Sequence, residues 1–338
     1  MKTVIWCAVT SIHRAVLCTV CLAALAFPAA ADTVAFSINY IDAPGAGFNA
    51  AGAAGAERRA AMNYAMSKYS GLFEAQYAGE EVRINASFTN TTWLGFAGPE
   101  RFFNGPFPLP NTMYGVAIAD HLWGGDIQNV LGYGPFNGPH ISIQFGNAYI
   151  DGAGSEFYFG TDGAVGGSEY DFASVALHEV THGLGLVSLV QESGAFYDFG
   201  WSGHNQPHVY DHFVYDPVSG KTLAQMTNAE RAVAIKSGNL VWNGANAVAA
   251  NGGVMPSIYN PDPFAPGSSI GHWDELTYPN ELMTPFINYG QSVHSLSPIT
   301  LGALQDIGWN VTPEPGTLTL VGVIIGVAVI RRRRKRAA

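Results

Sequence analysis

The chain has 338 residues, of which 40 are glycine and only 12% are charged. It has 16 Lys and Arg residues and 26 Asp and Glu residues. Two of the bases lie before residue 32, and six bases and one acid lie after residue 312. Residues 32–312 therefore contain 8 bases and 25 acids, a formal charge of −17. This length allows one large or two modest domains with a sizeable core. The negative charge argues against nucleic-acid binding, because phosphate backbones would be repelled.

The first 31 residues have the features of a secretory signal peptide. Lys2 and Arg14 precede an apolar run over residues 15–27, and small residues at 28–31 provide a cleavage site before Asp32. The run is shorter than the roughly 20 residues that a membrane-spanning helix needs, which favours a cleaved leader over an uncleaved anchor. All three cysteines lie in this leader, so the exported body can form no disulfide.

The front half of the body is predicted to combine a helix with strands. Residues 56–70 mix helix formers with spaced apolar residues, and Gly71 follows as a stop signal. Residues 82–88 and 140–145 alternate apolar with polar side chains, the period of strands with one buried face. Two alternatives stay open for 140–145: an edge strand that pairs with an extended peptide substrate, or an internal strand.

A glycine-rich acidic segment precedes the second predicted helix. It contains Asp151, Asp162, Glu169 and Asp171. Carboxylates are the ligands that Ca²⁺ prefers, but acidic turns form without any ion. A calcium site and a set of plain turns are both compatible with this segment.

The second helix is predicted to begin after the N-cap residue Asp171 and to end at Gly183 and Gly185. It carries the H-E-x-x-H motif His178-Glu179-Val180-Thr181-His182. The i, i+4 spacing stacks both imidazoles on one helical face, where they can bind one zinc ion. Glu179 then lies beside the metal as the catalytic base, taking a proton from a water whose pKa the metal lowers to about 7. The motif therefore predicts metal-assisted hydrolysis of peptide bonds.

The residues after the motif indicate a family. Gly185 extends it to H-E-x-x-H-x-x-G, which resembles the metzincin metallopeptidases. The compact metzincin pattern has a third histidine where Ser188 stands here, and serine is a poor zinc ligand. Downstream, His272 precedes Met283 by eleven residues, an order similar to the leishmanolysin type, in which an insertion separates the helix from the third histidine. The resemblance implies that His272 is the third zinc ligand and Met283 the Met-turn methionine.

The resemblance covers about 171–190 and 270–310, including a predicted closing helix within 297–309. It implies an α+β fold for residues 32–312: a metzincin-like catalytic domain with a mixed sheet, an active-site helix, a Met-turn and a C-terminal helix. The segment 191–269 would be the insertion. Its counterpart in the leishmanolysin family carries disulfides, which this cysteine-free body cannot form.

Three further histidines compete with His272 for the third ligand position. His204, His208 and His212 recur every four residues. Pro207 interrupts that stretch, and residues 209–215 read as a strand, so the three imidazoles would not share a helical face.

The remaining candidates are interpreted as structural. His121, His140 and His294 are isolated from one another along the chain. Tyr289 follows Met283 by six residues and could donate a hydrogen bond to a developing oxyanion, but core packing is the favoured interpretation.

The C-terminal 26 residues, 313–338, have the pattern of a sorting signal. Pro313-Glu314-Pro315 breaks regular structure, an apolar run follows at 318–330, and six bases follow at 331–336. The pattern predicts a single-pass helix with a basic cytoplasmic stop, and the bases argue against a buried helix. It resembles the PEP-CTERM signal, which implies an exosortase-type processing enzyme as partner, transient anchoring in the bacterial inner membrane through residues 317–336, and a final location at the cell surface or in the extracellular matrix.

Two functions of different classes follow from these observations. The leading one is an exported zinc-dependent endopeptidase that acts on proteins or peptides. The alternative is a noncatalytic surface or matrix protein whose metzincin-like domain is structural. The presence of Glu179 favours catalysis, because a noncatalytic protein could lose it and still bind metal.

Overall fold

A computed structural model describes residues 32–132, 137–150, 152, 156–200 and 205–312. The predicted signal peptide and the predicted single-pass helix of the sorting signal lie outside the described residues. Within those residues, no helix is long and apolar enough to cross a membrane. The described part is a mixed α+β fold, as the sequence predicted.

A four-stranded mixed sheet in the order β1-β2-β6-β3 supports the helix that carries the H-E-x-x-H motif. Strands β1 (Ala35–Tyr40), β2 (Glu81–Thr89) and β6 (Ile141–Gly146) are parallel, and β3 (Gly95–Pro99) is antiparallel to β6. The strands predicted at 82–88 and 140–145 are therefore confirmed. Because β6 lies between β2 and β3, the internal-strand alternative holds, and the free edge belongs to β3.

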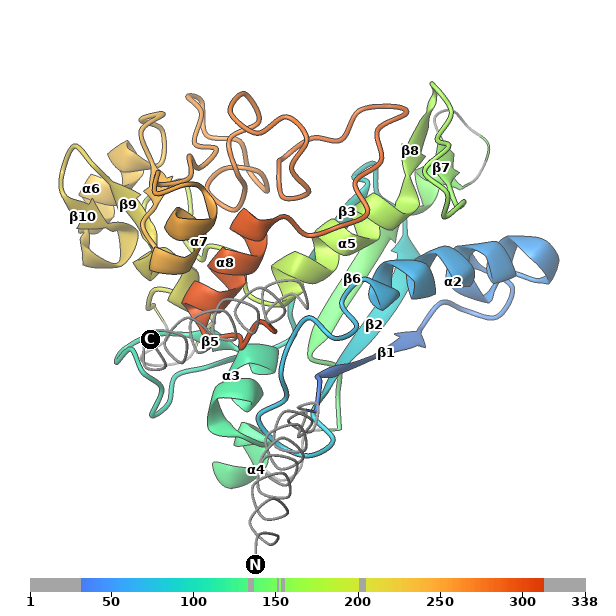
Figure 1. The fold of residues 1–338 in the computed structure, drawn as a ribbon, viewed down its shortest axis with the longest axis horizontal. Coiled ribbons are helices and arrows are strands. Elements are labelled where there is room, and N and C mark those ends of the chain that lie inside the picture. The colour runs from blue at the N-terminus through green and yellow to red at the C-terminus, as the bar shows by residue number, and fades with distance from the viewer. Residues whose placement is uncertain (1–31, 133–136, 151, 153–155, 201–204, 313–338) are drawn as a thin grey trace, which may run out of the picture. The chain divides into compact units, whose positions relative to one another are not determined.

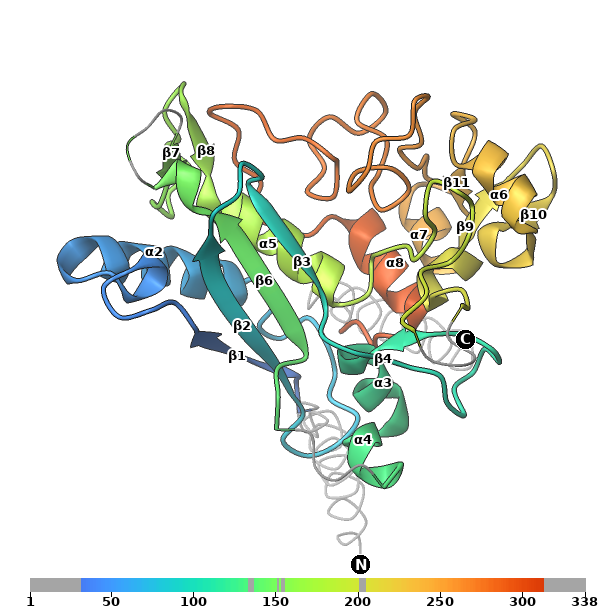
Figure 2. The same ribbon diagram turned by 180° about the vertical axis from the view of Figure 1, so that it is seen from behind.

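Two helices pack on the same face of this sheet, α2 (Gly52–Ser67) and α5 (Phe172–Gly183) (Figures 1 and 2). The strand residues that face them are buried: Val82, Ile84 and Ala86 in β2, and Ile141, Ile143 and Phe145 in β6. The opposite strand residues are at least partly exposed. Helix α2 begins four residues earlier than predicted. Its first turn consists of small residues and has no side-chain cap, so no start signal marks it in the sequence.

Helix α5 begins as predicted at the N-cap Asp171, whose carboxylate accepts a 2.8 Å hydrogen bond from Ser174 N–H. Its last residue, Gly183, lies against β6: a Cβ there would be 2.3 Å from Ile141 Cγ2. Only a glycine allows this close approach without a shift of the helix. The helix that carries the H-E-x-x-H motif is thereby placed tightly on the sheet.

The remaining elements include several short strands and helices. They are β4 (Phe102–Phe103), β5 (Tyr114–Gly115), α3 (Val116–Trp123), α4 (Ile127–Val130), β7 (Glu156–Tyr158), β8 (Glu169–Asp171), β9 (Val214–Asp216), β10 (Lys221–Thr222), α6 (Asn228–Ala234), β11 (Val241–Trp242), α7 (Ala245–Ala250) and α8 (Pro298–Ile307). Strands β10, β9 and β11 form a second sheet, and β7 pairs in parallel with β8. Helix α8 confirms the predicted closing helix.

The strand predicted at 209–215 is wrong in its first half. Residues Val209–His212 form a 3-10 helix, and only Val214–Asp216 is a strand. The Asp211 carboxylate accepts a 2.8 Å hydrogen bond from His208 N–H and closes the turn. The side-chain cap overrides the β-propensity of the valine and tyrosine residues around it.

Helices α7 and α8 pack against each other at the edge of the core. The Asp306 carboxylate accepts hydrogen bonds from Trp242 Nε1 and from the backbone N–H groups of Asn246 and Ala247, so it caps the start of α7. A Cβ at Gly302 would lie 2.7 Å from the Ala247 backbone. The two helix axes can be this close only because residue 302 has no side chain.

Replacing Gly302 with alanine is expected to lower the free energy of unfolding by about 1–3 kcal/mol, because backbone atoms cannot move aside easily. Urea denaturation would measure the change. The matched control is Gly167→Ala, where nothing lies within 4 Å of the added methyl group; it should change stability by less than about 0.5 kcal/mol. Equal effects of the two substitutions would show that the helix contact is not tight.

Candidate metal centre

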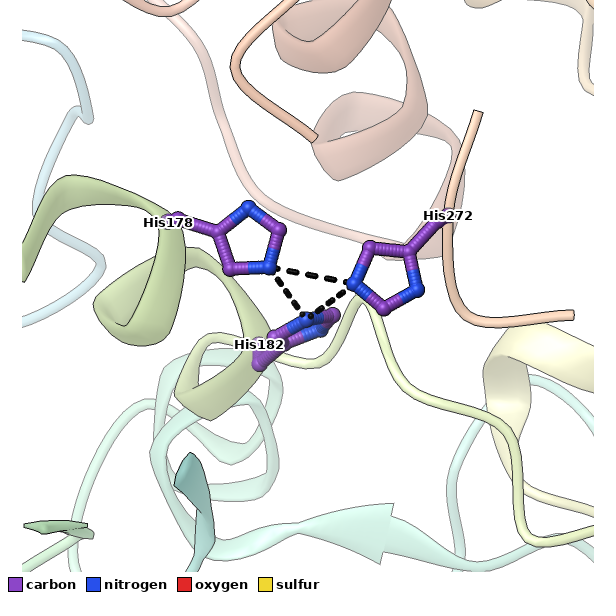
Figure 3. A group of neighbouring side chains, drawn as sticks. All are labelled: His178, His182 and His272. Carbon is purple, nitrogen blue, oxygen red and sulfur yellow. Dashed lines mark hydrogen bonds between the residues drawn. The ribbon is translucent and has the colours of Figure 1, made fainter. Parts of the chain in front are cut away.

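Three histidine side chains from two distant segments meet at one point. The Nε2 atoms of His178 and His182 are 3.0 Å apart, and the Nε2 atom of His272 lies 3.1 and 3.2 Å from them (Figure 3). Among the described residues, this is the group of His, Cys, Asp and Glu side chains that could hold a metal ion. The structure therefore brings together the three ligands expected from the sequence.

Each imidazole is oriented by a backbone carbonyl that its other nitrogen contacts. His178 Nδ1 bonds Leu282 O at 2.8 Å, His182 Nδ1 bonds Leu186 O at 2.7 Å, and His272 Nδ1 bonds Ser268 O at 2.7 Å. A carbonyl oxygen can only accept, so each Nδ1 carries the proton and each Nε2 presents a lone pair. The close N···N approaches drawn in Figure 3 are therefore lone pairs that face one another.

Burial keeps these imidazoles neutral. It lowers the pKa of His178 and lowers the pKa of His182 to about 3, with the neighbouring His178 adding to the effect. Burial and the two neighbouring imidazoles also hold the pKa of His272 well below its usual value. Protons therefore do not compete for the lone pairs, and a shared cation is the partner that relieves their repulsion.

The dimensions of the triangle suit a transition-metal ion. Nitrogens bound tetrahedrally at about 2.0–2.1 Å lie about 3.3–3.4 Å apart, only slightly more than the spacing of the three Nε2 atoms. His182 and His272 are buried, whereas His178 is partly exposed. The site can therefore offer three fixed nitrogens and leave a side open for a further ligand.

Gly185 shapes the chain after α5 so that His182 is held. Its φ of 117° lies in the region that favours glycine, and a Cβ there would come within 2.9 Å of Ile307 Cδ1. The turn returns the Leu186 carbonyl to His182. The glycine after the H-E-x-x-H motif therefore has a direct role in orienting the second ligand.

Met283 is buried, with 1% of its surface exposed. Its carbonyl accepts a 2.8 Å hydrogen bond from Trp273 N–H, next to the ligand His272. The preceding carbonyl, that of Leu282, holds His178. The turn at 282–283 thus connects the first ligand with the residue after the third one.

Glu179 lies between α5 and the edge strand β3. Burial raises the pKa of its carboxyl to about 8, against an opposing hydrogen bond from Ala97 N–H. A Cβ at Gly95 would stand 2.6 Å from the Glu179 carboxyl oxygen. The carboxyl group thus occupies space that any larger residue at position 95 would fill.

The two rival histidines that the structure describes, His208 and His212, are not brought to the three-histidine group. His208 donates from Nδ1 to Val187 O, and His212 Nε2 contacts Thr112 Oγ1 at 2.9 Å. His204 lies outside the described residues. Ser188 donates to the Asp211 carboxylate at 2.6 Å and supplies no ligand.

The isolated histidines make structural contacts, in line with their interpretation. His121 pairs with Glu80 at 2.6 Å, His140 with Asp120 at 3.3 Å and His294 with Asp171 at 2.7 Å. The expected core packing of Tyr289 is wrong, because 48% of this side chain is exposed. Gly290 N–H, next in the chain, donates to Glu169 O at 3.1 Å, and the Tyr289 ring packs on Tyr170 at the surface.

The acidic segment before α5 shows no clustered ligand set among its described members. Asp171 caps α5, Glu169 accepts a 2.9 Å hydrogen bond from Gly166 N–H, and Asp162 accepts from Tyr158. Asp151 lies outside the described residues. These contacts are those of acidic turns.

No protein-family model matches the chain, and no curated protein matches it. What the site can do is therefore derived from its own geometry.

Several site groups could not be found by reasoning from the sequence. The orienting carbonyls are backbone groups of Leu186, Ser268 and Leu282. Every residue has such a carbonyl, and the side chains of these three residues do not mark them as site residues. Gly95 is one of 40 glycines, and only its contact with Glu179 distinguishes it. No strand was predicted at 95–99, so Gly95 could not be recognised as a glycine at the start of a strand.

Metal binding can be tested directly. The purified protein is expected to retain about one transition-metal ion per chain after dialysis against dilute chelator, and His272→Ala to weaken binding more than about a hundredfold, because one of three nitrogens is lost. Elemental analysis would measure the metal. His212→Ala is the matched control and should retain it. Loss of metal from the control alone would assign the third ligand to the rival histidines.

Proposed function

We propose that this protein is an exported zinc-dependent endopeptidase of the metzincin type. The observation that carries the proposal is the convergence of three neutral imidazoles, with Glu179 next to the first of them on the same helix. The turn at Met283 and the glycine turn after α5 support the resemblance to metzincins. Each of these features orients a ligand, and Glu179 is the residue that a structural metal site would not need.

Zinc is the metal that this donor set suits best. Neutral imidazoles also bind copper, nickel and iron, but three histidines with an open fourth position form a common catalytic arrangement for zinc. When bound, zinc supplies Lewis-acid chemistry: it polarises a carbonyl and lowers the pKa of a water to about 7.

Glu179 is the residue placed to act as general base. Its carboxylate takes a proton from the attacking water and can then pass that proton to the leaving amine. A cation bound at the three histidines would favour the ionised carboxylate and lower the pKa that burial has raised. Ala97 N–H holds the carboxyl group in place during this exchange.

The edge strand β3 is proposed to bind the peptide substrate. One side of β3 is paired with β6, and the other is free of any strand partner in the described residues. An extended peptide can add to such an edge through its backbone, which places a peptide bond near Glu179. Pairing with an extended peptide substrate, which the sequence analysis considered for residues 140–145, is therefore proposed for residues 95–99 instead.

The location of the enzyme is proposed from the terminal segments. Residues 1–31 would direct export across the inner membrane, and residues 313–338 would hold the protein there until an exosortase-type enzyme processes it. Its substrates would then be proteins or peptides at the cell surface or in the extracellular matrix.

Glu179→Gln is expected to lower kcat by about 10²- to 10⁴-fold, because a general base contributes this much and glutamine cannot accept the proton. Cleavage of a mixed peptide library, followed by mass spectrometry, would measure it. Metal content should stay at the wild-type level. Unchanged cleavage in this variant would refute the mechanism, whereas a metal-bound wild type that cleaves nothing would favour the noncatalytic matrix protein.

The two glycines of β3 form a matched pair for a second test. Gly95→Ala should lower kcat by about tenfold or more, because the added methyl group displaces the Glu179 carboxyl by a fraction of an ångström. Gly98→Ala adds the same group to the same strand, where nothing lies within 4 Å, and should leave kcat unchanged. Equal kcat values for the two variants would mean that the Gly95 contact does not set the position of the base.

A further inference from the structure

A strained residue lies two positions before the third histidine ligand. Ile270 has a φ of 63°, in the left-handed region that a β-branched residue avoids because its Cβ crowds the backbone there. In the described part of the chain, the other non-glycine residue with a positive φ is Asn111, and asparagine adopts this region far more readily. A strained conformation persists only where surrounding contacts hold it, and such residues gather at functional sites. The contacts around Ile270 must therefore hold it in this conformation.

The turn at Ile270 lets the third ligand reach back along its own chain. His272 Nδ1 donates to the carbonyl of Ser268, four residues earlier, at 2.7 Å, and Ile270 is midway between them. This hydrogen bond turns His272 Nε2 toward the other two histidines (Figure 3). A return of Ile270 to an extended or right-handed conformation would change the direction of the chain between the two groups. The orientation of His272 therefore depends on the conformation of Ile270.

Hydrogen bonds hold Ile270 at both of its backbone groups. Its N–H donates to Tyr259 O at 2.7 Å, and Tyr259 N–H donates in turn to His272 O at 2.9 Å. Its carbonyl accepts a 2.6 Å hydrogen bond from the Tyr210 hydroxyl. The backbone bonds at position 259 could be made by any residue except proline, whereas the third bond requires the tyrosine hydroxyl. Tyr210 is therefore the side chain on which the turn depends.

The Tyr210 side chain is packed into the core beside this turn. It is 2% exposed, and burial raises the pKa of its hydroxyl, so the hydroxyl keeps its proton and donates. Its ring packs on Trp242 with centroids 4.9 Å apart, and Trp242 meets Trp273, the neighbour of His272, edge-on at 6.0 Å. Because packing fixes the ring, the hydroxyl cannot follow the Ile270 carbonyl if the turn relaxes.

The turn that carries Tyr210 is attached to the segment that follows the H-E-x-x-H motif. Tyr210 lies in the 3-10 helix Val209–His212, which belongs to the predicted insertion. The Asp211 carboxylate in this helix accepts a 2.6 Å hydrogen bond from Ser188 Oγ. Ser188 stands where the compact metzincin pattern has its third histidine. The residue at that position therefore contributes here through Asp211, by fixing the turn that reaches the segment of His272.

We propose that Tyr210 is the positioning residue of the third metal ligand. Its hydroxyl holds the Ile270 carbonyl, keeps the strained turn from relaxing and so keeps His272 Nε2 directed at the other two histidines. It acts through Ile270 and not as a ligand. This role rests on the metal centre of the proposed function, but it can be measured without any cleavage reaction.

The first variant is Tyr210→Phe, which removes the hydroxyl and keeps the buried ring. It is expected to weaken Zn²⁺ binding by about tenfold, because the Ile270 carbonyl loses its donor and the turn relaxes. Competition between the purified protein and a chromophoric chelator would measure the affinity. Tyr114→Phe is the matched control: Tyr114 is 1% exposed, its hydroxyl accepts a 3.2 Å hydrogen bond from Leu109 N–H, and β5 supplies no ligand. The control should bind Zn²⁺ as the wild type does.

Ile270→Gly tests whether strain is the link between the hydroxyl and the ligand. Glycine adopts the left-handed conformation without strain, so a turn with glycine needs the hydroxyl less. Combined with Ile270→Gly, the Tyr210→Phe substitution should weaken Zn²⁺ binding by less than about threefold, against about tenfold in the chain with isoleucine. A hydroxyl that only stabilised the core would cause the same loss in both backgrounds, so equal losses would overturn the assigned role.

The metal-free protein gives a second readout, which needs neither zinc nor cleavage. Side-chain nitrogen NMR reports which imidazole nitrogen bears the proton, and comparison with His272→Ala identifies the signals of His272. The wild type and Tyr114→Phe should show His272 protonated at Nδ1. Tyr210→Phe should show a mixture of the two tautomers, because the Ser268 carbonyl no longer fixes the proton on Nδ1.

The outcomes distinguish this role from the proposed function. An unchanged Zn²⁺ affinity in Tyr210→Phe, or an unchanged His272 tautomer, would overturn the role of Tyr210 even in an active peptidase. If the wild type binds zinc but cleaves no peptide, the peptidase function fails and the affinity comparison still decides the role of Tyr210. If the wild type binds no zinc, the proposed metal chemistry fails, and the tautomer comparison decides whether Tyr210 positions His272.

Discussion

Three hydrogen bonds from imidazole to backbone carbonyl determine what this site can do. Each one fixes the proton on Nδ1 and turns Nε2 toward the other two histidines. Without them the rings could rotate or adopt the other tautomer, and the lone pairs would no longer converge. Three lone pairs within 3.2 Å of one another repel, so the surrounding structure has to hold them together. The fold around the site keeps these three backbone carbonyls in the positions that orient the histidines.

A different local structure positions each of these carbonyls. The turn at Gly185 supplies Leu186 O, and the loop that carries His272 supplies Ser268 O to the histidine four residues later. The turn at Met283 supplies Leu282 O. Gly183 sets α5 on the sheet and Asp171 caps its first turn. The ligands are therefore positioned by local turns that a common core supports.

The sequence predicted the periodic elements and the residues whose chemistry is distinctive, but not the contacts that depend on tertiary structure. The alternation at 82–88 and the cap before α5 are local signals, and both elements formed. His272 was reached through a family resemblance, because ninety residues separate it from His182 and no periodicity spans such a gap. The strand predicted at 209–215 failed because the Asp211 side chain closed a turn. The free edge at β3 and the exposure of Tyr289 depend on strand order and loop path, which residue types alone do not encode.

The segment after Met283 is attached to α5 at both of its ends. At one end the Leu282 carbonyl holds His178. At the other, His294 donates to the Asp171 carboxylate at 2.7 Å, and Ser174 Oγ accepts from Val293 N–H at the same distance. Both attachments are on α5, about two turns apart. Tyr289 lies between them along the chain, so its place relative to His178 and His182 is set by the helix that carries both of them.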